Sequence, residues 1–230
     1  VKYLAEQTGI DFHNSDDLIA ATSDCGAYVA ISSAAKSLAV KLTKVCNDMR
    51  LLASGPRTGL SEINLPMRQP GSTIPANEPG SSIMPGKVNP VIPEVTNQAS
   101  FLAIGLDTTV MLAASAGQLE LNVMEPVISF AVFTQMKVLT NAMIALREKC
   151  VDGITANAEH TKDLVMNSLG IVTLLKPHFG YMLCAEMAKE GYTEGKSLHQ
   201  IVVEERKLMT EEKWNEVFSF QNLIAPKFEM

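Results

Sequence analysis

The chain has 230 residues, of which 47% are hydrophobic and 19% are charged, and its formal net charge is −6 at pH 7. This length can bury the core of one large domain, or of one domain with a small appendage. The basic residues are scattered along an acidic chain, which excludes the clustered positive surface of a nucleic-acid-binding protein.

The four cysteines lie far apart and form no C-x-x-C pair. This spacing argues against a zinc site and a disulfide framework, and it favours a reducing compartment, so we expect a cytoplasmic protein. The first ten residues mix polar and apolar side chains, unlike a secretory signal peptide. We expect residues 1–5 to be the end of a helix that is already under way.

The first long helix is predicted to start near Asp16 and to run for about 35 residues. Apolar side chains recur along it at alternating spacings of four and three, which is a heptad seam. This pattern is typical of a helical-bundle core. The seam consists of Ile31, Ala35, Leu38, Leu42, Val45, Met49 and Leu52.

A connection rich in proline and glycine follows, at residues 55–93, and a connection of this length is usually functional or disordered. Its most unusual part is residues 80–90, which read GSSIMPGKVNP. The glycines let backbone N–H groups converge, the lysine adds a positive charge and the asparagine adds amide donors. Because this segment leads into a helix N-terminus, where anions bind, we predict a mobile lid that binds a carboxylate.

Two further long helices are predicted near residues 94–116 and 126–149. Asp107 is the one charged residue between positions 95 and 119, and Lys137 is the one between positions 126 and 146. Both stretches approach membrane-spanning length, but their Ser, Thr, Asn and Gln content is better suited to soluble helices buried on all sides. Three long helices cannot bury one another completely, so we expect helices from other subunits to complete the bundle.

Beyond Gly153 charges become frequent and glycines divide the pattern into short helices. Ser197 and Thr210 are predicted to be the N-caps of two of these helices. The expected fold class is therefore all-α, with a long-helix bundle and a small helical C-terminal domain. We expect the first domain to comprise residues 1–153 and the second to comprise residues 154–230.

The segment 80–90 resembles the GSSxMPxKxN signature of the aspartase/fumarase superfamily, whose members eliminate a group from a succinyl-type substrate and release fumarate. Residues 91–98 (VIPEVTNQ) and 117–126 (GQLELNVMEP) resemble the aspartate ammonia-lyases more than the class II fumarases. Residues 54–60 (SGPRTGL) and 153–157 (GITAN) fit the same picture. The resemblance covers nearly the whole chain.

This resemblance implies an ammonia-lyase that converts L-aspartate reversibly to fumarate and ammonia. It also implies a homotetramer with a shared helix bundle and active sites formed by three subunits. The substrate would be a small dicarboxylate, with no nucleic acid, membrane or organic cofactor involved. Some relatives use a divalent metal activator, but the four histidines have no metal-ligand spacing, so we expect no metal site here.

Site residues are carried over from the resemblance one by one. Ser81 would be the general base, activated by backbone N–H groups and by nearby Lys87 when the lid closes. Ser82 would donate to the substrate carboxylate that becomes the enediolate, and Lys87 and Asn89 would bind a substrate carboxylate. Glu94 matches the position that, in relatives, pairs with an active-site histidine from another subunit.

The sequence departs from the superfamily in lacking the earlier substrate-binding segments, including any Thr-His pair. A tetramer of this chain alone would have incomplete active sites, so we expect it to be inactive unless the absent part is supplied. Two alternatives to an ammonia-lyase therefore stay open. One is a class II fumarase acting on malate, and the other is an inactive truncated scaffold.

A second departure is a partial duplication within the lid, where residues 69–74 (QPGSTI) echo residues 78–83 (EPGSSI). Removing residues 71–79 would restore a family-like segment. Loop-closure entropy grows slowly with length, so folding should tolerate the insertion. Ser72 is a possible decoy for Ser81, but no Gly-Lys-x-Asn follows it at the matching distance. We expect deletion of residues 71–79 in a complete enzyme to preserve or raise activity.

Overall fold

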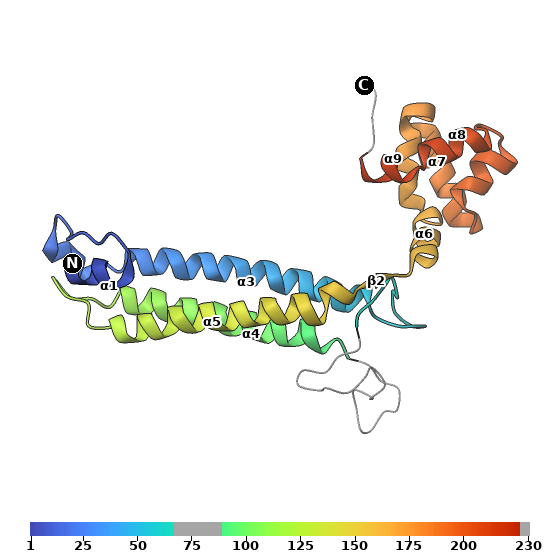
Figure 1. Ribbon diagram of the computed structural model, residues 1–230. Coiled ribbons are helices and arrows are strands. Elements are labelled where there is room, and N and C mark those ends of the chain that lie inside the picture. The colour runs from blue at the N-terminus through green and yellow to red at the C-terminus, as the bar shows by residue number, and fades with distance from the viewer. Residues whose placement is uncertain (67–88, 226–230) are drawn as a thin grey trace. The chain divides into compact units, whose positions relative to one another are not determined.

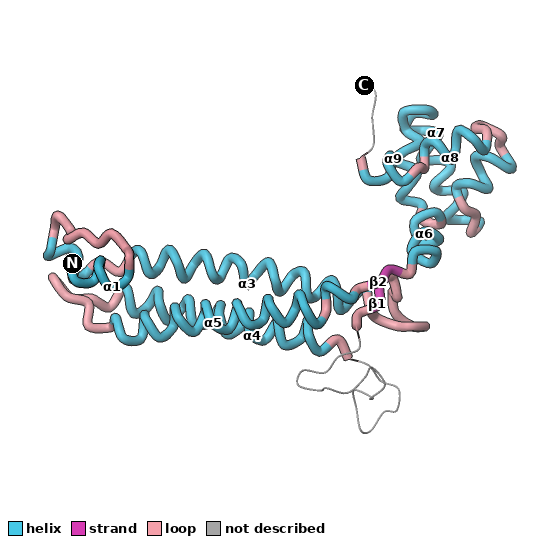
Figure 2. The backbone as a smooth tube through the Cα atoms, viewed as in Figure 1, coloured by secondary structure: helices cyan, strands magenta, loops and turns pink. Residues whose placement is uncertain are grey.

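The computed structural model describes residues 1–66 and 89–225. The chain divides into two compact units, which we name the bundle unit (Val1–Thr155) and the C-terminal unit (Ala156–Met230). Helices dominate both units, and the described residues contain one short pair of strands (Figure 2). The expected all-α fold class is confirmed.

The bundle unit is built on three long helices, α3 (Gly26–Leu52), α4 (Val91–Ala114) and α5 (Glu125–Lys149). They lie side by side, with α4 antiparallel to the other two (Figure 1). Helix α4 packs extensively on both α3 and α5. Its position between them explains why its polar side chains as well as its small apolar ones are buried.

The core of the bundle unit lies in three clusters along these helices. Near the start of α3, Cys25 packs with Val110 and Ile128, and in the middle Ala39 packs with Ala103 and Leu139. At the other end the cluster consists of Cys46, Ile92, Leu146 and Cys150. Small residues in the middle cluster allow the helices to approach closely, and larger side chains fill the two ends.

The predicted 35-residue helix is divided in the structure. A short helix, α2 (Leu18–Ser23), ends at Asp24, and α3 begins only at Gly26. The Asp24 side chain accepts a hydrogen bond from the Gly26 backbone N–H at 2.8 Å, which favours a new helix start over continuation of the old helix. The prediction of one uninterrupted helix from Asp16 was therefore wrong. An isolated helix, α1 (Lys2–Thr8), precedes α2.

The heptad seam on α3 also divides in an unexpected way. Three seam residues, Ile31, Leu38 and Val45, are more than one-third exposed in the described chain. The side that packs inside this unit is marked instead by Ser32, Ala39 and Cys46, which are fully buried. Helix α3 thus has two apolar lines, one facing α4 and α5 and one facing away from them.

Short irregular segments join the long helices. Strands β1 (Ile63–Asn64) and β2 (Thr155–Ala156) form a two-stranded ladder, in which Asn64 Nδ2 donates to Thr155 Oγ1 at 3.2 Å. A 3-10 turn, η1 (Val151–Gly153), leads from α5 into β2.

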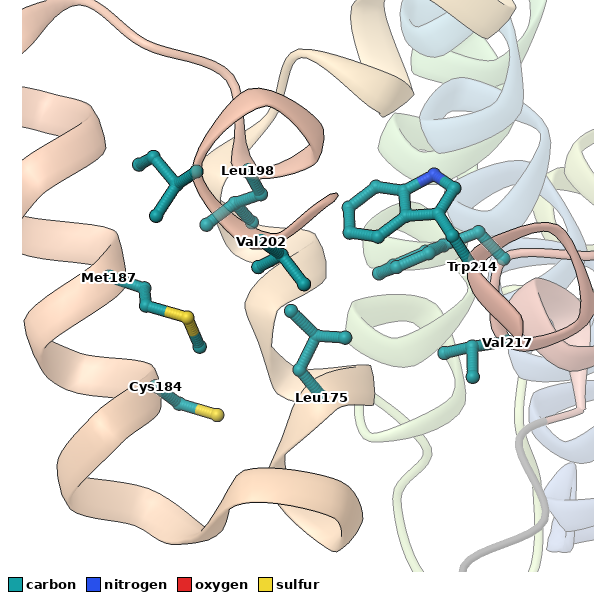
Figure 3. Packing of buried hydrophobic residues seen from close by; sticks show 9 residues of the cluster. Leu175, Cys184, Met187, Leu198, Val202, Trp214 and Val217 are labelled. Atoms are coloured by element: carbon teal, nitrogen blue, oxygen red, sulfur yellow. The ribbon is translucent and has the colours of Figure 1, made fainter. Parts of the chain in front are cut away.

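The C-terminal unit contains α6 (Ala158–Met166), η2 (Leu169–Leu175), α7 (Lys176–Glu194), the π-helical turn η3 (Gln200–Glu205), α8 (Glu211–Val217) and α9 (Phe220–Ile224). Its core surrounds Trp214, which is 2% exposed (Figure 3). Val202, Met187 and Leu175 belong to the same cluster. This core is separate from the clusters of the long helices.

Both predicted caps in the C-terminal unit are confirmed. Thr210 caps α8, with its side chain accepting from Lys213 N, and Ser197 Oγ accepts from Gln200 N at 3.1 Å. The turn that follows Ser197 is π-helical, which the sequence pattern did not indicate. Ile201 and Val202, which are neighbours in this turn, are both fully buried.

Residues 125–153 form the one segment of the described chain that is long and apolar enough to cross a membrane by length and composition. Core helices of soluble proteins pass the same test. Here α5 packs along α4 and buries Gln135, whose side-chain amide donates to Ala103 O at 2.9 Å.

Candidate functional site

Three of the five predicted site residues, Ser81, Ser82 and Lys87, lie outside the described residues. The structure does place Asn89 and Glu94, at the point where the signature segment enters α4. Asn89 is half-buried just before the helix, and its carbonyl accepts a hydrogen bond from Val91 N at 2.9 Å. Glu94 is half-buried in the first turn of α4. The two residues therefore share one helix end.

The start of α4 is fixed by backbone and apolar contacts. Glu94 N–H donates to Pro90 O at 3.1 Å, so Pro90 serves as the first carbonyl of the helix. Ile92 is 3% exposed and packs in the end cluster with Cys46 and Leu146. These contacts fix where α4 begins.

The Glu94 side chain also contacts the end of α3. Its Oε1 lies 3.8 Å from Arg50 Nη2, in the last turn of α3. An acidic residue at a helix N-terminus and a basic residue at a helix C-terminus each favour the local helix dipole. The antiparallel packing of α3 and α4 brings these two favourable charges together.

Two asparagines extend this contact by one helical turn. Asn47 Oδ1 accepts from Arg50 Nη1 at 3.4 Å and from Asn97 Nδ2 at 2.8 Å. Asn97 is 4% exposed, and its own Oδ1 has no hydrogen-bond partner among the described residues. We name Asn47, Arg50, Glu94 and Asn97 the helix-end network. It ties the last two turns of α3 to the first two turns of α4.

The cysteines near this network are structural. Burial and the neighbouring Cys150 raise the pKa of Cys46 to about 11. The hydrogen bond with Thr96 and the positive charge of Arg50 act in the opposite direction but are smaller. Burial also raises the pKa of Cys150. Because a nucleophilic cysteine needs its thiolate form, these two thiols are unsuited to covalent catalysis.

The turn after α3 is held by hydrogen bonds from backbone N–H groups. Ser54 Oγ accepts from Leu60 N at 3.1 Å, and Ser54 O accepts from Ser61 N at 2.7 Å. A Cβ atom added to Gly59 would lie 2.5 Å from Ser54 O, so the turn requires glycine at that position. This turn is formed by the SGPRTGL segment, residues 54–60.

A second polar group lies farther along α4. Asp107 is 6% exposed and receives hydrogen bonds from Ser32 Oγ at 2.8 Å, Ser33 Oγ at 3.3 Å and Lys36 Nζ at 2.5 Å. Thirteen residues separate Asp107 from Glu94, which is roughly 20 Å at the helical rise. This group therefore holds α3 against α4 and is separate from the candidate site.

At the opposite end of α4, Asn122 organises the connection to α5. Its Nδ2 donates to Ala113 O at 3.0 Å and to Ala114 O at 3.2 Å, and its Oδ1 accepts from Met124 N at 2.9 Å. The sequence placed Asn122 within a family-typical motif without assigning it a role. In the structure its side chain binds carbonyls at the end of α4 and the backbone N–H of Met124, just before α5 begins.

Sequence reasoning did not single out Arg50, Asn47 or Asn97. A weak signal was present, because a basic residue closes one predicted helix and an acidic residue opens the next. Their pairing depends on how α3 and α4 pack, and periodicity does not give that information.

No group of three or more His, Cys, Asp and Glu side chains suited to hold a metal occurs in residues 1–66 and 89–225. Glu94 lies beside a cation, which suits an ion pair or an oriented hydrogen bond better than metal ligation. The described part of the site can thus supply the Glu94 carboxylate and the Asn89 amide at the N-terminus of α4.

Comparisons with known proteins point to one family of lyases. Family models described as "Lyase" and "Fumarase C C-terminus" match residues 1–105 and 171–225. The aspartate ammonia-lyase of Escherichia coli strain K12 is 54% identical over 229 residues, covering 100% of this chain and 46% of that protein.

Solved structures show the same fold. A fumarate lyase:delta crystallin protein from Brucella melitensis, bound to cobalt, has a TM-score of 0.82 and 42% identity, covering 93% of this chain and 44% of that one. The class II fumarase of Schistosoma mansoni has a TM-score of 0.82 and 32% identity, covering 99% of this chain and 47% of that one.

The chain spans about half the length of the relatives it matches (46% of the E. coli protein). Along that half, sequence and fold both correspond to these relatives. The chain belongs to the aspartase/fumarase superfamily of lyases.

Proposed function

We propose that the chain is the central and C-terminal part of an aspartate ammonia-lyase, a carbon–nitrogen lyase that converts L-aspartate to fumarate and ammonia. The observation that carries this proposal is 54% identity to the E. coli aspartate ammonia-lyase along the entire chain. Identity to the class II fumarase of S. mansoni is lower, at 32%.

The chemistry defines what the site must do. A base takes a proton from the carbon beside one carboxylate, and ammonia leaves from the neighbouring carbon, so that aspartate gives fumarate. The negative charge that develops spreads onto that carboxylate as an enediolate. Fixed donors around its oxygens lower the barrier most, and the base must be within hydrogen-bond reach of the proton.

In this proposal Ser81 is the general base and Ser82 donates to the developing enediolate. Lys87 and Asn89 bind a substrate carboxylate through a cation and an amide. Glu94 orients a histidine from another subunit. The placement of Asn89 and Glu94 at one helix end supports their sharing a site, because both follow closely in sequence the segment that carries Ser81.

We also propose a homotetramer with active sites shared between subunits. Large apolar side chains on the long helices support it, since many are well exposed within one chain. They include Ile31 and Leu38 on α3, Phe101 and Leu112 on α4, and Phe130 and Phe133 on α5. Burying such area in a neighbouring subunit would contribute roughly 25 cal/mol per Å².

The superfamily needs no organic cofactor, and a divalent metal activator would be an addition to the reaction rather than part of it. A cytoplasmic location is part of the proposal. It is supported by four buried cysteines in the thiol form.

The experiment that tests the function uses this chain joined to the N-terminal segment of the E. coli relative that the chain does not match. Fumarate is followed by its ultraviolet absorbance with L-aspartate as substrate. Ser81→Ala should reduce kcat by at least about 10²-fold, because base catalysis is lost. Ser72→Ala is the matched control, and it should leave kcat unchanged.

Loss of activity in Ser72→Ala with retention in Ser81→Ala would overturn the assignment of the base. Fumarate formed from L-malate instead of L-aspartate would identify a fumarase. A correctly assembled protein that releases no fumarate from either substrate would favour the inactive scaffold.

A further inference from the structure

The helix-end network contains a cation for which the proposed reaction has no assigned use. Arg50 lies in the last turn of α3, with Nη2 at 3.8 Å from Glu94 Oε1 and Nη1 at 3.4 Å from Asn47 Oδ1. Asn47 in turn accepts from Asn97 Nδ2 at 2.8 Å. The Arg50 guanidinium thus contacts Glu94 in the first turn of α4 and also Asn47, which is hydrogen-bonded to Asn97 in the second turn of α4.

The geometry of the two helices makes this contact directional. Asn47 and Arg50 are three residues apart on α3, and Glu94 and Asn97 are three residues apart on α4, so each pair lies on one helix face. The antiparallel helices therefore form a two-rung ladder. The Asn47–Asn97 rung is the shorter, and it fixes the register in which Arg50 meets Glu94.

The ion pair between Arg50 and Glu94 is too weak to contribute much to the stability of the fold, so its role is to orient the Glu94 side chain. The side chains of Arg50 and Glu94 are 43% and 38% exposed, so water screens their attraction and the pair adds little to the free energy of unfolding. At 3.8 Å the contact is an ion pair rather than a hydrogen bond, and the charge of the guanidinium still favours the carboxylate torsions that face it. Restricting those torsions matters where the carboxylate must meet another group.

We propose that Arg50 is a positioning residue for the elimination. It holds the Glu94 carboxylate at the start of α4 in the orientation that pairs with the histidine of another subunit. This inference rests on the proposed function, in which Glu94 orients that histidine. Arg50 itself contacts neither substrate nor the reacting atoms in this account.

The test in the joined protein compares Arg50→Met, Arg50→Lys and Glu94→Gln with a matched control, Arg147→Met. Methionine keeps the apolar stem and helix propensity of arginine but removes the charge and the donors. Arg147 also lies in the last turn of a long helix and pairs with an acidic residue, Glu148, at 2.6 Å.

Arg50→Met should lower kcat roughly 10- to 100-fold with a smaller change in KM, because a misoriented catalytic group costs rate rather than binding. Arg50→Lys should restore part of the loss, and Arg147→Met should have the unsubstituted kcat. The double variant Arg50→Met with Glu94→Gln should lose no more kcat than Glu94→Gln alone, since both substitutions act through the Glu94 carboxylate. Fully additive losses, or an unchanged kcat in Arg50→Met, would overturn the proposal.

A second measurement uses the chain alone and does not depend on activity. Amide hydrogen exchange at residues 94–97 should be roughly two- to fivefold faster in Arg50→Met, the size expected for loss of a half-exposed pair, and unchanged in Arg147→Met. Unchanged exchange in Arg50→Met would overturn the positioning role. If the unsubstituted joined protein releases no fumarate while the exchange result holds, the proposed function fails and the contact of Arg50 with α4 stands.

Discussion

Asp107 shows how a single buried charge is satisfied between two helices. Burial by itself would raise the pKa of this carboxyl, but hydrogen bonds from Lys36 and Ser32 and the positive charge of Lys36 outweigh burial, so that the pKa is lowered. The Lys36 side chain is 43% exposed, so the pair lies at the edge of the core rather than inside it. The carboxylate therefore links α3 to α4 without a fully buried cation.

We predict that Asp107→Asn lowers the free energy of unfolding by about 1–2 kcal/mol, because Lys36 loses its counter-charge and the serines lose an anionic acceptor. Urea unfolding followed by circular dichroism measures this change. Asp48→Asn is the matched control. Asp48 pairs with Lys44 on the same helix as Lys36 but is half-exposed, and its loss should cost at most about 0.5 kcal/mol. Equal costs for the two variants would contradict this role of Asp107.

The same carboxyl predicts a pH dependence. Because its pKa is lower in the folded chain than in the unfolded chain, the stabilisation is complete above the unfolded value, about 3.9, and is lost as pH falls through the folded value. The difference in unfolding free energy between the unsubstituted chain and Asp107→Asn should therefore shrink as pH falls below about 4. A difference that stays constant from pH 7 to pH 3 would show that the charge makes no contribution.

At the scale of elements, α8 depends on its cap. Thr210 accepts from Lys213 N, and Trp214, the chain's one tryptophan, follows within the same helix. Thr210→Ala should lower the stability of the C-terminal unit by about 1 kcal/mol. Trp214 fluorescence during urea unfolding reports this directly. Thr193→Ala, in the last turn of α7 and exposed, is the control, and it should shift the transition by much less.

The connection between α4 and α5 depends on a different device, a buried amide. Asn122→Ala should cost about 2 kcal/mol and should speed amide exchange around residues 115–124, because two carbonyls and one backbone N–H lose their partner. Asn141→Ala, on the exposed side of α5, should leave stability unchanged or slightly raised, since alanine favours a helix. If Asn122→Ala proved as harmless as Asn141→Ala, this role of Asn122 would be wrong.

Long apolar stretches with few charges were sufficient to predict α4 and α5 to within a few residues. The predicted start at Glu94 is three residues beyond the observed start at Val91, because Pro90 rather than a later residue supplies the first helical carbonyl. The break at Asp24 was missed because the apolar pattern continues through it, while the hydrogen bond from Gly26 N to Asp24 depends on one side chain.

Contacts between residues far apart in the chain could not be predicted from the sequence. The helix-end network and the Asp107 group both join α3 to α4 across more than forty residues of chain, and their pairing follows from helix packing. The resemblance supplied five site residues, of which Asn89 and Glu94 lie in the described part, beside the same helix start. Arg50 carried no motif of its own, so the structure was needed to relate it to Glu94.

At the scale of the whole molecule, the exposed apolar side chains of the long helices predict association. Phe133 on α5 is 70% exposed, and burying it in another subunit would contribute about 2 kcal/mol. Phe133→Lys should shift the joined protein from tetramer toward smaller species, because an unpaired charge at a subunit contact is costly.

Sedimentation velocity measures that shift, and circular dichroism checks that helix content is retained. Tyr192→Lys replaces an even more exposed aromatic side chain in the C-terminal unit and should leave the tetramer intact. An unchanged tetramer in Phe133→Lys would place the subunit contact elsewhere on the bundle unit.

The central claim is that this chain is part of an ammonia-lyase, and the most direct test is fumarate release by the joined protein with L-aspartate and L-malate assayed in parallel. We predict that ultraviolet absorbance rises with L-aspartate and that equimolar ammonia is formed, with no fumarate from L-malate. Fumarate from L-malate alone, or from neither substrate in a protein shown to be a tetramer, would contradict the account.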